Sequence, residues 1–188
     1  MRNHYLSIAF MFVAPAAAWA HGEGAHNHVG LIAGLIHPFS GLDHLLAVLA
    51  VGLWAAQQGG RARWILPLSF VSAMAAGVAL GADGMALPGV EVGIGVSVLA
   101  LGILLALQTR WVLPLASLTV GTFALFHGAA HGQEMPLIAT PWVYGVGILA
   151  ATAALHAMGV LAGRKLHKTW MRAAGVTLSL AGLGLMLT

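Results

Sequence analysis

Two short polar segments, residues 37–44 and 126–134, hold most of the side chains in this chain that could carry out chemistry. They contain four histidines and two acidic residues: His37, Asp43, His44, His127, His131 and Glu134. The chain has no cysteine, so imidazole nitrogens and carboxylate oxygens are the ligands on offer. Such a set suits Ni²⁺, Co²⁺, Zn²⁺ or Cu²⁺, whereas Mg²⁺ and Ca²⁺ prefer oxygen alone. The two segments therefore predict a site for a divalent transition metal.

The second segment is typical of a helix that presents metal ligands on one face. His127 and His131 are four residues apart, and Glu134 follows three residues later. Residues at these spacings share a helix face. Two imidazoles one turn apart can hold a single divalent ion, and the carboxylate can join them.

The first segment predicts a break in the chain. Pro38 removes a backbone donor and disfavours helix at the residue before it. On a regular helix, Asp43 and His44 would point about 100° apart, so binding one ion with both requires the irregular backbone that Pro38 and Gly41 permit. Ser40-x-x-Asp43 also matches a capping box. The alternative is therefore that Asp43 caps a helix, and the two roles are compatible.

The composition indicates an integral membrane protein. Hydrophobic residues make up 60% of the 188 residues and charged residues only 7%, against about 25% charged in soluble domains. We predict an all-α polytopic membrane helical bundle over residues 29–188, with a broken or re-entrant segment at 29–36 before the first span. Six apolar runs approach the ~20 residues of a spanning helix: 40–57, 64–82, 88–107, 111–131, 141–162 and 170–188.

The N-terminus resembles a secretory signal. Arg2, an apolar run and the Ala18-Trp19-Ala20 motif predict a cleaved signal peptide over residues 1–20. An uncleaved anchor helix is the alternative. Cleavage would leave a His-rich segment, residues 21–28, outside the cytoplasm. We expect its three histidines to collect metal without forming the central site: His21, His26 and His28.

The charges indicate an orientation. Seven of the eight basic residues fall in alternate loops, which the positive-inside rule places in the cytoplasm: Arg61, Arg63, Arg110, Arg164, Lys165, Lys168 and Arg172. All five acidic residues fall in the outer half of the predicted bundle. The outer side is therefore suited to attract a cation.

Two further residues are secondary ligand candidates. Glu91, near the outer end of the third span, is a possible ligand, proton relay or hydrogen-bond partner of an imidazole. His156, in the inner half of the fifth span, is a possible exit station, and a histidine bonded to a neighbouring helix is the alternative.

The chain also contains an internal echo. Arg63-Trp64-Ile65-Leu66-Pro67-Leu68 resembles Arg110-Trp111-Val112-Leu113-Pro114-Leu115. This predicts a repeated helical hairpin, over about 63–107 and 110–162.

The two metal motifs resemble those of a known family. His37-Pro38-x-x-Gly41-x-Asp43-His44 and Phe126-His127-Gly128-x-Ala130-His131-Gly132-x-Glu134 are similar to the signature pair of the HupE/UreJ family of nickel permeases. The resemblance covers essentially the whole chain. It implies secondary uptake of Ni²⁺, in some members Co²⁺, to supply hydrogenase or urease. Together with the predicted signal peptide, this predicts a protein of the bacterial inner membrane with a periplasmic mature N-terminus. The resemblance carries the six residues of the two motifs over as transport residues.

Other functions stay open on the sequence alone. No Gly-x4-Gly-Lys-Ser/Thr motif occurs, so no P-loop nucleotide site is expected, and neither a prosthetic group nor a nucleic-acid partner is predicted. An intramembrane metal-dependent hydrolase would use Asp43 or Glu134 as general base. A membrane-anchored metal sensor or chaperone is the third possibility. The ion itself, as transported substrate, and the lipid bilayer are the partners that we expect.

Overall fold

The computed structural model describes residues 23–85, 87–137 and 139–187, which form helices and connecting turns without a strand. The expected all-α class is confirmed. The predicted signal peptide and His21 lie outside the described residues. In chain order the helices are α1 (Glu23–Ile36), the short 3-10 helix η1 (His37–Phe39), α2 (Leu42–Gln58), α3 (Ala62–Ala82), α4 (Val90–Ala106), α5 (Leu113–Gln133), α6 (Pro141–Lys165) and α7 (Lys168–Leu185).

Each of the six predicted apolar runs coincides with one of the helices α2 to α7. These helices differ, however, in whether their length and hydropathy suffice to span a bilayer. Three of them, α3, α5 and α6, are long and apolar enough, and α1 with α2 forms a fourth candidate if the bent pair is one span. Helix α4 has only 17 residues, and α7 begins with Lys168 and Arg172 in its first turns. The structure thus supports a multi-pass membrane protein, and the count of six spans stays a prediction.

The predicted break at Pro38 is confirmed. The segment from Gly30 to Phe39 and helix α2 meet at an angle of 77°. Gly41 forms the corner, because its backbone is extended at φ −102° and ψ 117° and it caps α2 without a side-chain hydrogen bond. The bend separates His37 on η1 from Asp43 and His44 in the first turn of α2.

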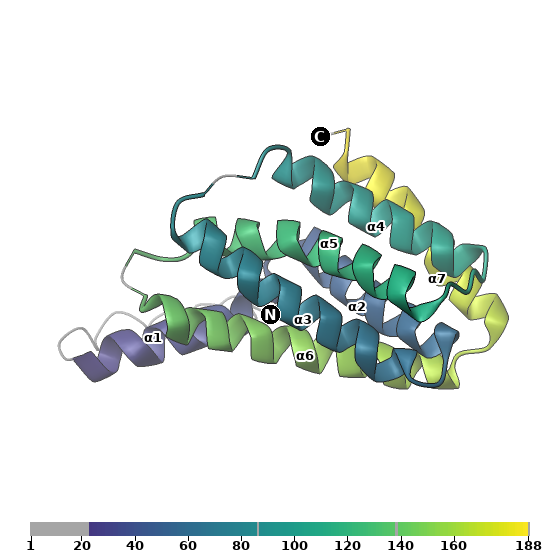
Figure 1. The fold of residues 1–188 in the computed structure, drawn as a ribbon, viewed down its shortest axis with the longest axis horizontal. Coiled ribbons are helices and arrows are strands. Elements are labelled where there is room, and N and C mark those ends of the chain that lie inside the picture. Colours follow the sequence, from purple (N-terminus) through teal and green to yellow (C-terminus); the bar gives the residue numbers. More distant parts are fainter. Residues whose placement is uncertain (1–22, 86, 138, 188) are drawn as a thin grey trace, which may run out of the picture.

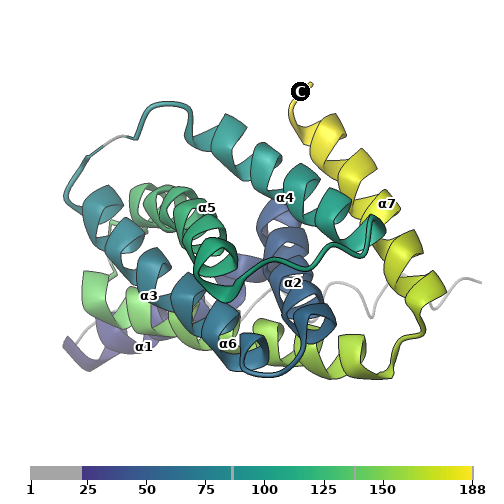
Figure 2. The ribbon, with the colours of Figure 1, turned by 45° about the vertical axis from the view of Figure 1, so that its right-hand side comes forward.

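The helices pack in pairs that are not consecutive in the chain. Helix α3 lies against α5, α4 against α7, and both α1 and α2 against α6; Figures 1 and 2 show the first two pairs side by side. Glycine faces glycine at each of these crossings: Gly77 and Gly128, Gly102 and Gly175, Gly52 and Gly159, Gly34 and Gly147. A Cβ on Gly128, Gly159 or Gly147 would lie 2.9–3.0 Å from the Cα of the facing glycine, so small residues allow this close approach.

The basic loops gather at one end of the bundle. Gln57 and Gln58, at the end of α2, donate hydrogen bonds to the carbonyls of Thr109 and Trp111 in the α4–α5 loop, at 3.1 and 3.2 Å. The loop after α2 and the loop after α4 are therefore joined, and the two metal motifs lie at the other end of α2 and α5.

The echoed sequences start their helices differently. Pro67 lies inside α3, whereas Pro114 occupies the first turn of α5. Helices α3 and α5 pack directly on each other. The hairpin repeat over 63–107 and 110–162 stays a prediction.

The glycine contacts generate a stability prediction. Gly77→Ala should destabilise the protein, by about 1–3 kcal/mol, because the added methyl must separate two backbones. Gly121→Ala on α5 is the matched control: its Cβ would meet only the Ala73 methyl, at an ordinary 3.7 Å. Thermal unfolding of the purified proteins in detergent would measure both. Equal midpoints for the two variants would contradict a packing role for the glycine pairs.

Candidate metal site

A polar pocket lies at the motif end of the bundle, where η1, the start of α2, the start of α4 and the end of α5 meet. Its volume is about 290 Å³. Five of the six motif residues line it, together with Glu91, Ser40 and Gly41: His37, Asp43, His44, His131 and Glu134. The sixth, His127, lies one turn deeper along α5. The structure therefore brings the two motifs together.

The outer part of the pocket is a group of three ligand atoms, two of them on side chains that water can reach. His37 Nε2 donates a hydrogen bond to Glu134 Oε2 at 2.9 Å, and the two side chains are 24% and 53% exposed. His131 completes the group, since one ligand atom from each residue lies within 4.8 Å of the other two. This outer group offers two imidazoles and one carboxylate.

The inner part is a cluster of buried imidazoles. The His44 ring lies 4.8 Å from that of His127 and 4.3 Å from that of His131, between ring centres. These three histidines are only 6%, 0% and 2% exposed, respectively. His131 thus belongs both to the outer group and to this inner cluster.

Asp43 orients His44. Its Oδ1 accepts hydrogen bonds from the His44 backbone N–H at 2.8 Å and from His44 Nδ1 at 2.9 Å. Because Nδ1 carries the proton, Nε2 has a free lone pair, and it is buried without a hydrogen-bond partner among the described residues. A carboxylate that holds an imidazole in this way is the usual support of a metal-binding histidine. The capping box considered from the sequence is not formed, because Gly41 and not Ser40 caps α2.

Ser97 orients His127 in the same way. The Ser97 hydroxyl donates to the Ile94 carbonyl at 2.7 Å, so its oxygen accepts a hydrogen bond from His127 Nε2 at 2.8 Å. His127 Nδ1 therefore keeps its lone pair, and it too is buried without a described partner. Two imidazoles of the inner cluster are thus fixed in tautomers that present a nitrogen ligand.

The secondary candidates lie in different places. Glu91 is exposed in the first turn of α4 and lines the pocket. His26 and His28 lie in the first turns of α1, and His28 is exposed. His156 is buried on α6, away from this pocket.

Sequence reasoning missed three residues that lie against the histidines: Ser97, Tyr144 and Phe70. The Phe70 ring centre is 5.8 Å from that of His127, and nothing in the sequence distinguished it from other apolar residues. The sequence could have indicated a role for Ser97, because its hydroxyl lies in the middle of an apolar span, where polar groups need a hydrogen-bond partner. No such indication existed for Tyr144: its ring lies 5.7 Å from that of His37, and the side chain is fully buried.

Comparison with known proteins shows which family the chain resembles. The family described as HupE / UreJ protein matches residues 8–185. Protein HupE of Rhizobium leguminosarum bv. viciae is 47% identical over 179 residues, which cover 90% of this chain and 94% of that protein. No solved structure matches the chain. With both signature motifs assembled at one pocket and a match along nearly its whole length, the chain belongs to the HupE/UreJ family.

Proposed function

We propose that this protein is a secondary transporter that imports Ni²⁺ across the bacterial inner membrane to supply a metalloenzyme such as hydrogenase or urease. The observation that carries the proposal is the convergence of the two motifs on one pocket, with a cluster of three buried imidazoles at its inner side. The family is associated with nickel and cobalt transport. Co²⁺ is the alternative substrate, because the ligand types suit both ions.

The arrangement of the ligands favours transport over hydrolysis. A hydrolase needs one fixed ion with an open coordination position. Here the imidazoles continue inward from the exposed outer group to the buried inner cluster, with His131 shared between them. An ion can move along such a series by exchanging one ligand at a time, which a single catalytic ion does not require.

The charge distribution suits import. We propose six spans, with the pocket facing the periplasm and the basic loops facing the cytoplasm. The acidic side chains of Asp43, Glu91 and Glu134 at the pocket attract a dication from outside. A dication crossing about 100 mV, negative inside, gains about 4.6 kcal/mol, from about 2.3 per charge. The membrane potential can therefore drive uptake without ATP.

The function is tested by uptake of radioactive nickel into proteoliposomes with an imposed potential. Wild-type protein should accumulate nickel, and competition by added cobalt and by added zinc would measure the selectivity among ions that this ligand set suits. His44→Ala and His127→Ala should each reduce uptake to the background of empty vesicles, because each removes a ligand of the inner cluster. His167→Ala is the matched control: this histidine is the N-cap residue just before α7, and among the described residues its ring nitrogen bonds only Thr169. Normal uptake by well-inserted His127→Ala protein would contradict the proposal that the transported ion binds at this histidine cluster.

Ser97 supplies a separate prediction about orientation. Ser97→Ala leaves His127 Nε2 without its acceptor, so the ring can turn or change tautomer, and we expect the apparent KM for nickel to rise about 10-fold. Ser179→Ala is the matched control, since that hydroxyl also bonds the carbonyl of its own helix, Gly175, at 2.9 Å. An unchanged KM in the Ser97 variant would show that His127 is not held by this bond.

A further inference from the structure

His156 is a buried imidazole whose role the outer pocket does not explain. It is 1% exposed on α6, and neither of its ring nitrogens has a hydrogen-bond partner among the described residues. A polar group buried without a hydrogen bond costs free energy. Such a residue in the interior of a membrane protein points to a function.

One aromatic ring separates His156 from the inner cluster. The Phe70 ring on α3 lies 5.8 Å from that of His127 and 4.9 Å from that of His156, between ring centres. Phe70 is fully buried. The described structure therefore places imidazoles on both sides of a single side chain, and movement of that side chain would bring them into reach of the same ion.

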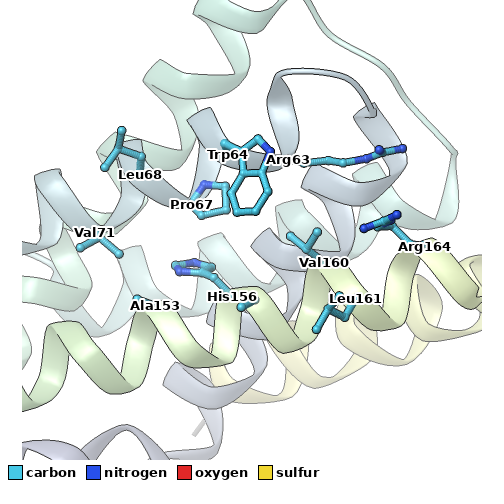
Figure 3. Close-up of a pocket in the computed structure, with 11 residues that line it drawn as sticks. Arg63, Trp64, Pro67, Leu68, Val71, Ala153, His156, Val160, Leu161 and Arg164 are labelled. Atoms are coloured by element: carbon cyan, nitrogen blue, oxygen red, sulfur yellow. The ribbon is translucent and has the colours of Figure 1, made fainter.

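A second pocket begins at His156 and leads toward the basic end of the bundle. It lies between α3 and α6, and its volume is about 470 Å³. Figure 3 shows the imidazole extending from α6 toward Pro67 and Val71 of α3, with Arg63 and Arg164 farther along the pocket. Apart from His156 and the two arginines the lining side chains are apolar, so the imidazole is the one side chain in this pocket that can bind a cation.

We propose that His156 is an inner station for the transported metal ion, reached from His127 past Phe70 on the way to the basic end of the bundle. The inference rests on the proposed function of import. A single imidazole holds a dication weakly, and the positive charges of Arg63 and Arg164 disfavour a cation that remains beside it. The ion is therefore released from this station and is stored in the outer pocket.

The test separates binding from transport. His156→Ala and the more conservative His156→Gln would be compared with wild-type protein by nickel-binding calorimetry in detergent and by nickel uptake into proteoliposomes. We expect both variants to keep the wild-type affinity of the outer pocket and to lose uptake by about tenfold or more. Thr152→Val is the matched control, because it removes another fully buried polar group of α6, one turn away, whose hydroxyl contacts Met74 Sδ at 3.7 Å. It should transport normally.

Three results would overturn the inference. Wild-type uptake by both His156 variants would show that the ion does not use this residue. A loss of binding that matches the loss of uptake would assign His156 a structural role. A wild-type protein that neither binds nor accumulates nickel would overturn the proposed function as well, whereas the first two results leave that function intact.

Discussion

An imidazole buried among apolar helices has two nitrogens, and each needs a partner. In His44 and His127 one nitrogen is hydrogen-bonded, to Asp43 and to Ser97, which fixes the tautomer. The other nitrogen has no described protein partner. Two lone pairs are thus held ready inside the bundle, at a cost that a bound metal ion would offset. The metal site depends on these two hydrogen bonds, because without them neither ring has a defined orientation.

The scaffold brings these rings together through close backbone contacts and one break. The glycine crossing of α3 and α5 sets Gly77 against Gly128, directly beside His127. The 77° bend ahead of α2 lets His37 approach His131 from one side while His44 approaches it from another, with ring centres 4.8 and 4.3 Å from that of His131. On a straight helix His37 and His44 would share a face but lie about 10.5 Å apart along the axis, so the bend is what brings both rings close to His131.

Much of this could be predicted from the sequence, and the exceptions have physical reasons. Ligand spacing on α5 and the break at Pro38 are local properties, so the i, i+4 pair and the proline were enough to find them. The partner of each imidazole is a tertiary property. Ser97 and Phe70 are far from both motifs in the chain, and only the packing of α4 and α3 against α5 places them beside His127. Asp43 was recognised, but its bond to His44 depends on the corner at Gly41.

Nickel K-edge X-ray absorption of the purified, nickel-loaded protein tests the central claim most directly, because it reports the atoms around the ion. The chain has no cysteine, so we predict a first shell of nitrogen and oxygen, with the outer-shell scattering of several imidazoles. That imidazole signal should decrease in His44→Ala and in His127→Ala protein. A spectrum of oxygen ligands alone, as for hydrated nickel, would contradict the proposal that buried histidines bind the transported ion.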